Sequence, residues 1–347
     1  MLGDDHMIIT KLLLMKKKIA IVFAFILIVS FAGLFIFSSN PKILSDEDYS
    51  KALEHSNKVF SVALPDYIEF AGEAPPLGLY YVREGLDREL TINTYWHSST
   101  IIMIKRSARY FPIIEPILKA HGVPDDFKYL ALIESGLTNV VSPAGASGIW
   151  QIIDETGNRY GLEINEEIDE RYHLEKSTAA ACRILKNSYN KYKNWSLAAA
   201  AYNAGDGRIE KELKRQKVTS FYDLHLNNET SRYLFRILAL KILYETPTKY
   251  GYYLRKKDLY PNIPTFSVTV DSSINSLIDF ALKHKVNYRI LKEFNPWLRK
   301  DKLTNPTHKS YLITFPKEGF TDYGVLLKDG ADNNAIFNDT IQTITKP

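Results

Sequence analysis

The sequence predicts a mainly α-helical protein, in which an all-α domain of about 140 residues is followed by a small β-α-α-β unit of about 50 residues. Between residues 106 and 245 apolar residues recur at helical spacing, and no segment alternates as a strand does. Residues 266–315 instead contain two alternating segments, with two short helical patterns between them. With 347 residues, the chain is long enough for two or three domains with their own cores.

The composition is that of an ordinary globular protein, with 45% hydrophobic and 24% charged residues. The net charge of +4 is too weak to indicate nucleic acid binding, and no basic helix or basic aromatic surface supports it. We therefore expect no nucleic acid partner. The single cysteine, Cys182, lies in an alanine-rich helical pattern and is expected to be a small buried residue.

The N-terminal 40 residues have the pattern of an export signal. Three lysines, Lys16 to Lys18, precede a charge-free and mostly apolar run from Ile19 to Phe37. The run is long for the apolar region of a signal peptide and near the minimum for a membrane-spanning helix. Residues 1–40 are therefore predicted to be either a signal peptide or an N-terminal membrane anchor. No cysteine lies nearby, which excludes a lipoprotein.

The next elements are an N-terminal extension and a long helix. Residues 41–105 have weak periodicity, for which we expect an extended arm and one or two helices. Apolar spacing then predicts a helix over residues 106–121, which Pro112 and Pro116 are expected to break or restart.

A second helix is expected through residues 129–133. Asp125 and Asp126 place negative charge in its first turn, which the unpaired N–H groups at a helix N-terminus favour. Gly136 is expected to end it, because glycine readily adopts the left-handed conformation of a helix C-terminus. Further helices are predicted over residues 149–159, 177–192, 195–202 and 229–244.

The C-terminal third changes character. Residues 246–264 are rich in Tyr, Lys and Pro and are interpreted as a linker after the helical domain of residues 106–245. The small unit covers residues 265–316, with strands at its two ends. The tail, residues 317–347, is polar and is expected to be loosely ordered.

The sequence excludes several kinds of chemistry. The eight histidines are scattered, with no pair at helical ligand spacing, so we expect no metal and no cofactor. Ser147 lies in no G-x-S-x-G turn, and no glycine-rich phosphate loop opens a helix after a strand. The candidate that remains is Glu134, an ionisable residue at the end of an apolar helix.

Three effects at Glu134 favour its protonated form. Its neighbours one turn earlier are Leu130 and Ala131, so it shares an apolar face, and burial raises the pKa of a carboxyl. The negative end of the helix acts in the same direction. A carboxylic acid that stays protonated near neutral pH is what glycosidic bond cleavage requires as its general acid. From spacing alone, however, a surface glutamate at a fraying helix end is the more frequent case.

The other candidate residues each have a purely structural alternative. Residues 148–151 could begin a helix with a buried Trp150, Tyr202-Asn203 could be a helix terminus, and Tyr233 could be core. Taken together, amides and aromatic rings at helix ends are what a sugar-binding site needs.

At this point the motifs match a known family. Residues 106–245 resemble the lytic murein transglycosylases with a goose-lysozyme-like, SLT-type catalytic domain, and the likeness is greatest to their membrane-bound D type. The matching motifs are Glu134-Ser135-Gly136, Gly145-Ala146-Ser147-Gly148-Ile149-Trp150-Gln151, Asp169-Glu170-Arg171, Ala200-Ala201-Tyr202-Asn203-Ala204-Gly205 and Glu229-Thr230-Ser231-Arg232-Tyr233. Upstream, Phe70-Ala71-Gly72-Glu73 and Arg88-Glu89-Leu90 also look like that group's N-terminal extension.

Two departures from the family pattern stand out. After Asp169-Glu170-Arg171 the family usually continues with Asp-Pro, where this chain has Tyr172-His173. Residues 266–316 resemble a LysM peptidoglycan-binding module, especially at Leu291 to Pro296. Val270 to Ser273 replaces the usual Lys-Gly-Asp-Thr start, so the module is interpreted as degenerate.

The resemblance implies that Glu134 is the sole acid/base, which cleaves the β-1,4 bond between N-acetylmuramic acid and N-acetylglucosamine. The product would be a 1,6-anhydromuramoyl end, formed without water, in cell wall remodelling. Implied partners are peptidoglycan glycan strands, with no cofactor, and the implied location is the periplasmic side of a bacterial envelope. The implied substrate-binding residues are Ser135, Gly148, Gln151, Tyr202, Asn203 and Tyr233.

Two other functions remain as alternatives. A muramidase would hydrolyse the same bond, for which it needs a positioned water and a second carboxylate; Asp154 and Glu155 are weak candidates. A catalytically idle wall-binding protein would account for the LysM-like module but would leave the surroundings of Glu134 unexplained.

Overall fold

The computed structural model describes residues 59–329. The expected leader or anchor, residues 1–40, and the end of the tail from residue 330 lie outside the described residues. Within residues 59–329, no helix combines the length and apolar character needed to cross a membrane.

Two consecutive helices begin the described chain. Helix α3 (Tyr80–Tyr95) is followed, after one residue, by α4 (His97–Ala120). The expectation that Pro112 and Pro116 break the second helix is wrong, because both lie inside a continuous α4. The two prolines are four residues apart and lie off the buried face that carries Phe111 and Ile114. The carbonyls that they leave without a helical partner therefore lie on the less buried side of the helix.

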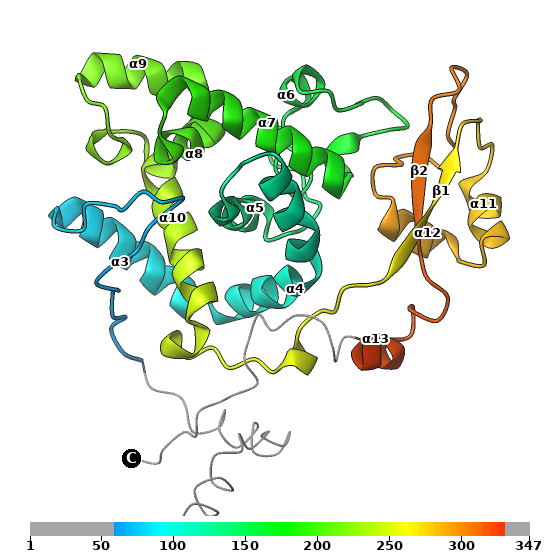
Figure 1. The fold of residues 1–347 in the computed structure, drawn as a ribbon, viewed down its shortest axis with the longest axis horizontal. Coiled ribbons are helices and arrows are strands. Elements are labelled where there is room, and N and C mark those ends of the chain that lie inside the picture. Colours follow the sequence, from blue (N-terminus) through cyan, green and yellow to red (C-terminus); the bar gives the residue numbers. More distant parts are fainter. Residues whose placement is uncertain (1–58, 330–347) are drawn as a thin grey trace, which may run out of the picture. The chain divides into compact units, whose positions relative to one another are not determined.

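The helix that carries Glu134 is short and central. A 3-10 turn, η1 (Asp125–Phe127), leads into α5 (Lys128–Ser135), so the two acidic residues precede the α-helix itself. All residues from Tyr129 to Ile133 are buried. Helices α4 and α10 pack against α5, which lies in the middle of the helical domain (Figure 1). Gly136 ends the helix in the left-handed conformation with φ 60°, as predicted.

The remaining helices of this domain largely follow the sequence pattern. The prediction for residues 149–159 is wrong in its first half, since only the second half is helical and residues 147 and 152 form a β-bridge instead. One helix was not expected at all, the highly charged α9. The bounds are α6 (Asp154–Arg159), η2 (Glu170–Tyr172), α7 (Leu174–Tyr192), α8 (Trp195–Ala204), α9 (Asp206–Gln216), η3 (Phe221–Asp223) and α10 (Asn228–Glu245).

The segment interpreted as a linker is packed onto the helical domain. It contains the 3-10 turns η4 (Pro247–Tyr250) and η5 (Lys256–Asp258). Tyr252 is buried, and its hydroxyl donates to the carbonyls of Asn93 and Thr94 at 3.0 and 2.6 Å. Buried side chains of residues 246–264 belong to the same hydrophobic core as those of the helices. The segment is therefore held along its length rather than free.

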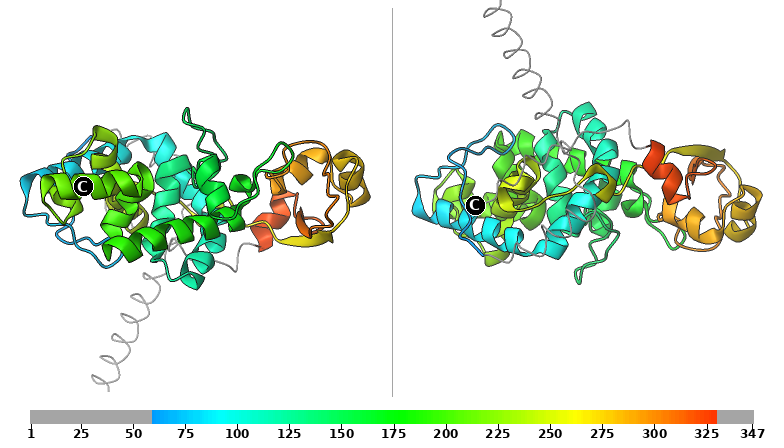
Figure 2. Two further views of the ribbon diagram at one scale, coloured as in Figure 1. Left: turned by 90° about the horizontal axis from the view of Figure 1, so that it is seen from above. Right: turned by 90° about the horizontal axis from the view of Figure 1, so that it is seen from below.

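The predicted β-α-α-β unit is confirmed. Strands β1 (Thr265–Val270) and β2 (Tyr311–Pro316) pair antiparallel, with Thr265 opposite Pro316 and Val270 opposite Tyr311. Helices α11 (Leu277–Lys283) and α12 (Tyr288–Phe294) lie between them in sequence and beside them in space (Figures 1 and 2, yellow to orange). The expectation of a loosely ordered tail is wrong for its first part, which forms α13 (Tyr323–Asp329).

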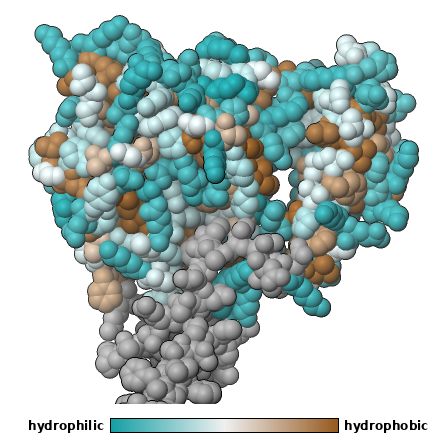
Figure 3. All heavy atoms as spheres, viewed as in Figure 1, coloured by the Kyte–Doolittle hydropathy of each residue, from teal (hydrophilic) through white to brown (hydrophobic). Residues whose placement is uncertain are grey.

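Two hydrophobic cores result. The larger one joins the helices of the helical domain, where Cys182 is buried as expected. The smaller one fills the β-α-α-β unit but also contains Ile168 and Tyr172, which come from the helical domain. The face seen in Figure 3 is mostly hydrophilic, with hydrophobic side chains in small groups between polar ones. The mainly α fold class with a C-terminal β-α-α-β unit is thus confirmed.

Candidate active site

Glu134 is the next-to-last residue of α5 and its side chain is largely buried. The hydroxyl of Tyr233, on α10, donates a hydrogen bond to Glu134 Oε1. Loss of water around the carboxylate raises the pKa of Glu134 from 4.5 to about 7. The carboxyl is therefore about half protonated at neutral pH, whereas an exposed glutamate would be fully ionised.

Burial is the largest cause of this pKa, and the nearby polar groups modify it. The Tyr233 hydroxyl and the charge of Arg236 lower the pKa because both stabilise the carboxylate, while the charge of Glu229 raises it. The negative end of the helix contributes less than the sequence argument assumed, since two arginines bind its carbonyls. Arg236 donates to the carbonyl of Ile133 and Arg106 to that of Gly136, both at 3.1 Å.

Three polar residues of α10 face this helix end. Glu229, Tyr233 and Arg236 are spaced by four and three residues, which places them on one side of the helix. Sequence reasoning had named only Tyr233 as a site residue. The signal that could have identified the other two is their helical spacing from Tyr233, at four residues before it and three after it.

The hydroxyl of Ser135 binds backbone carbonyls and not the carboxyl of Glu134. This hydroxyl donates to the carbonyl of Ile149 at 2.8 Å and, with a longer contact, to that of Ala131 at 3.3 Å. Among the hydrogen bonds of the described residues, none joins Ser135 to the carboxyl of Glu134. The serine therefore holds the loop of residues 140–152 against the end of α5.

That loop, residues 140–152, is held by its own backbone. Ser147 and Ile152 exchange N–H to carbonyl bonds of 3.0 and 3.2 Å, and the N–H of Gly148 donates to the carbonyl of Val140. Gly148 has φ +79°, and a Cβ added there would lie 2.0 Å from the carbonyl oxygen of Arg171. Only glycine fits at this position, because the backbone of another segment passes directly against it.

The motif residues after Gly148 have distinct positions. Trp150 is fully buried, and its indole N–H donates to the hydroxyl of Thr178 at 2.8 Å, so its ring is core. Gln151 has φ 49°, and its side-chain amide donates to the carbonyls of Val140 and Gly148 at 3.0 and 2.7 Å. The structural alternative is therefore correct for Trp150, whereas Gln151 remains partly exposed in the loop.

The end of α8 connects this loop to α10. The Tyr202 hydroxyl donates to the carbonyl of Trp150 at 2.7 Å. The amide of Asn203 donates to Glu229 at 3.3 Å and accepts from the Thr230 hydroxyl at 2.9 Å. The structure thus brings the motifs of α5, the loop, α8 and α10 together around Glu134, although they are up to about 100 residues apart in sequence.

The N-terminal extension supports the same helices. The carboxylate of Glu73 accepts from the N–H groups of Trp195 and Ser196 at 2.5 and 2.9 Å, and so caps the start of α8. The buried Glu89 accepts two hydrogen bonds from the guanidinium of Arg232, the neighbour of Tyr233 on α10.

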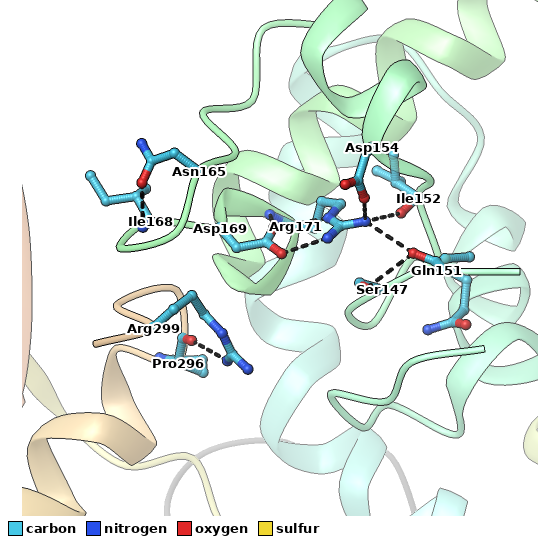
Figure 4. A network of polar contacts seen from close by, with 12 residues as sticks. Ser147, Gln151, Ile152, Asp154, Asn165, Ile168, Asp169, Arg171, Pro296 and Arg299 are labelled. Atoms are coloured by element: carbon cyan, nitrogen blue, oxygen red, sulfur yellow. Dashed lines mark hydrogen bonds and ion pairs between the residues drawn. The ribbon is translucent and has the colours of Figure 1, made fainter. Parts of the chain in front are cut away.

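The two weak candidates for a second carboxylate are both engaged elsewhere. Asp154 forms an ion pair with Arg171, and the exposed Glu155 pairs with Arg159 at 2.6 Å. Figure 4 shows Asp154 beside Arg171, together with the loop residues Ser147 and Gln151. Among the described residues, no group of three or more potential metal ligands lies close together.

Replacing Gly148 with alanine is expected to cost about 3 kcal/mol of stability or more, because the new methyl group collides with the Arg171 carbonyl. Gly145 is a matched control, since it has the same φ of +79° and a Cβ there meets nothing within 4 Å. Gly145→Ala should therefore cost only about 1 kcal/mol from backbone strain. Urea unfolding measures both; equal losses would show that the close approach does not matter.

Replacing Glu134 with glutamine is expected to stabilise the protein at about pH 8 and not at about pH 4. A carboxyl whose pKa rises from 4.5 unfolded to about 7 folded lowers stability as pH increases through that window, by about 3 kcal/mol in total. Glutamine has no proton to lose and keeps an oxygen that accepts from Tyr233.

The measurement is the free energy of unfolding at both pH values, with Glu166→Gln, an exposed position, as control. A gain that is the same at both pH values would contradict the raised pKa.

Comparison with known proteins finds two domain models that match parts of this chain and a relative that matches about half of it. Residues 111–224 match the family model of the transglycosylase SLT domain, and residues 266–319 match that of the soluble lytic transglycosylase C-terminal LysM-like domain. The membrane-bound lytic murein transglycosylase D of Escherichia coli K12 is 33% identical over 183 residues, which cover 51% of this chain. The matched region spans 40% of the length of that relative.

Solved structures also match, and two of them are each 19% identical to this chain. The 70 kDa soluble lytic transglycosylase of Escherichia coli covers 47% of this chain and 31% of its own, with a TM-score of 0.36. An inactive mutant of the lytic transglycosylase Slt of Pseudomonas aeruginosa covers 41% and 24%, with a TM-score of 0.32. The family models and the curated relative agree with the resemblance drawn from the motifs. The chain therefore contains a transglycosylase SLT domain followed by a LysM-like domain, and it is homologous to membrane-bound lytic murein transglycosylase D.

Proposed function

We propose that this protein is a lytic transglycosylase that cleaves the β-1,4 bond between N-acetylmuramic acid and N-acetylglucosamine in peptidoglycan. The observation that carries the proposal is Glu134, a buried carboxyl with a pKa of about 7 at the centre of the family's motifs. A group with this pKa can both give and take a proton near neutral pH.

Glu134 acts as the only acid/base in the proposed reaction. Its proton goes to the glycosidic oxygen as the bond from that oxygen to C1 of the muramoyl residue breaks. The C6 hydroxyl of the same residue then attacks C1, and its proton returns to the carboxylate. The product is a 1,6-anhydromuramoyl end, so water is not consumed and the enzyme ends in its starting state.

Each of the surrounding residues has one role in this proposal. Tyr233 keeps the carboxyl in one orientation by donating to Oε1, and Tyr202 fixes the loop through the Trp150 carbonyl. Gln151 and Asn203 carry amides that can turn to hydroxyl or acetamido groups of the glycan. Ser135 and Gly148, which were also expected to bind substrate, are better supported as residues that hold the loop.

The hydrolytic alternative has less support. A muramidase needs a second carboxylate to position water. Asp154 and Glu155 are held in ion pairs, and Glu229, whose charge reaches Glu134, accepts from the amide of Asn203. A catalytically idle wall-binding protein is also less supported, because it leaves the raised pKa of Glu134 without a use.

We further propose that the protein works in cell wall remodelling on the periplasmic side of the envelope. The proposal rests on the export pattern before residue 40 and on a relative named as membrane-bound, with attachment through Ile19–Phe37 as one form of it. In the proposed organisation, residues 41–105 are the extension, 106–245 the catalytic domain and 265–316 the LysM-like module.

The decisive experiment is mass spectrometry of muropeptides from digested sacculi. The wild type should release 1,6-anhydromuropeptides, and Glu134→Gln should reduce their release by about a thousandfold or more, since glutamine cannot transfer the proton. Glu166→Gln should leave the release unchanged. Reducing ends without anhydro products would establish hydrolysis instead, and cleavage by the glutamine variant at the wild-type rate would remove Glu134 from the mechanism.

The pH dependence of kcat/KM, which reports the pKa values of the free enzyme, tests the hydrogen bond from Tyr233. Activity of the wild type should fall above about pH 7, where the acid form of Glu134 is lost. In Tyr233→Phe this fall should occur at higher pH, because the variant loses a hydrogen bond that favours the carboxylate.

Tyr202→Phe is the matched control, since the Tyr202 hydroxyl donates to the Trp150 carbonyl and not to Glu134. It should keep the wild-type pH profile whatever its rate. The same profile in both phenylalanine variants would contradict the assignment of the Tyr233 hydrogen bond.

A further inference from the structure

One segment of the helical domain, residues 163–173, has two opposite sets of contacts. Ile168 and Tyr172 are buried in the small core of the LysM-like module rather than in the core of their own domain. Arg171, between them in sequence, has a side chain only 8% exposed and contacts the loop of residues 140–152. The segment therefore connects the module to the loop beside Glu134.

The contacts with the module involve both backbone and side chains. The N–H of Asp169 donates to the carbonyl of Trp297 at 2.9 Å, and that of Arg299 to the carbonyl of Glu167 at 2.7 Å. The carboxylate of Glu167 accepts from the N–H and hydroxyl of Thr304 at 2.7 and 3.0 Å. These bonds fix the segment at several points along its length.

Two aromatic side chains of the segment, those of Tyr172 and His173, lie in this contact. The guanidinium of Arg299 lies 4.2 Å from the centre of the Tyr172 ring, and the His173 ring stacks on Trp297 at 5.7 Å. Both contacts need the aromatic rings that Tyr172 and His173 supply.

Arg171 carries the contact to the other side. Asp169 binds the Arg171 guanidinium through both carboxylate oxygens, at 2.9 and 2.6 Å. The remaining nitrogen, Nη1, donates to the carbonyls of Gly145 and Ile152, at 3.1 and 3.4 Å, and pairs with Asp154. Figure 4 shows this guanidinium between Asp169 and the loop. Asp169 thus makes both contacts. Its backbone N–H binds the module, and its carboxylate binds the guanidinium of Arg171.

The backbone of Arg171 makes a second contact with the loop. The carbonyl oxygen of Arg171 is the group that leaves no room for a side chain at Gly148. Movement of Arg171 would therefore displace Gly148 and the residues on either side of it. Those residues include Ile149 and Trp150, whose carbonyls accept from Ser135 and Tyr202.

We propose that the LysM-like module is a fixed brace of the active-site loop, and that Arg171 is the positioning residue through which it acts. The function of the loop in this inference rests on the proposed transglycosylase activity. The module then contributes to substrate positioning through its contact with residues 163–173, in addition to any binding of glycan by itself. Weakening the contact between the module and residues 163–173 therefore makes residues 140–152 more mobile, although no residue of that contact touches the substrate.

The test uses the full-length protein and hydrogen exchange measured by mass spectrometry without substrate. In the double variant Glu167→Ala/Arg299→Ala, exchange in residues 140–152 should become about tenfold faster, because the bonds of Glu167 to Thr304 and the contact of Arg299 with Tyr172 are lost. Lys300→Ala is the control for the arginine substitution, since it removes a positive charge next to Arg299 at an exposed position whose side chain has no hydrogen bond or ion pair among those of the described residues. It should exchange as the wild type.

A second variant tests Arg171 independently of the module. Arg171→Lys keeps the charge but cannot bind Asp169 and the loop carbonyls at the same time, so residues 140–152 should again exchange faster. Both variants should raise KM for glycan strands several-fold and leave the pH at which kcat falls unchanged. A general loss of stability would reduce the active fraction without raising KM.

Unchanged exchange in residues 140–152 of the double variant would overturn the proposal, whether or not residues 163–173 exchange faster. Faster exchange in the Lys300→Ala control to the same degree would also overturn it. Absence of anhydromuropeptides from the wild type would instead refute the proposed activity, and the exchange experiment would still decide whether the module braces the loop.

Discussion

The burial of one carboxyl group determines how the rest of this site is built. Glu134 lies at the end of a short helix whose preceding five residues are buried, and this position raises its pKa to about 7. Ionised at high pH, the group costs the folded protein about 3 kcal/mol, a large part of the stability of a typical domain. The surrounding structure has to offset this cost through packing and hydrogen bonds, one of which is made to the carboxyl itself.

Those interactions come from every part of the helical domain. Helix α10 supplies the Tyr233 hydroxyl and the charge of Arg236, and Glu89 of the N-terminal extension holds α10 through Arg232. Glu73 of the same extension caps the start of α8. The extension therefore supports the candidate site, because it binds α8 and α10, which carry Tyr202 and Tyr233. On the other side, the 140–152 loop is held by residues 163–173 and, through them, by the LysM-like module.

Where prediction from sequence succeeded, the deciding interactions are local. Gly136 ends α5 because a glycine adopts the left-handed conformation at low cost, whatever surrounds it. The β-α-α-β unit was found because alternation over six residues and helical spacing over seven are visible in the sequence itself. Where prediction failed, the deciding contacts are distant. Residues 149–153 form a loop through bonds to residues 140 and 147, and Pro112 is tolerated in α4 because of the side of the helix on which it lies.

The sequence by itself determined the helical class of the protein, the position of Glu134 at the end of an apolar helix and, through the ordered motifs, the likeness to the SLT domain that matches residues 111–224. Both the period of a helix and the motif order are properties of neighbouring residues, so no fold is needed to see them. Only the tertiary structure decided which groups surround the carboxyl, since Tyr233 is 99 residues away in sequence. It also decided that Trp150 is core, that Gly148 makes room for the Arg171 carbonyl, and that a second domain holds the segment behind it. Burial and hydrogen bonding depend on which segments contact each other in space, and these contacts cannot be inferred from the spacing of residues along the chain.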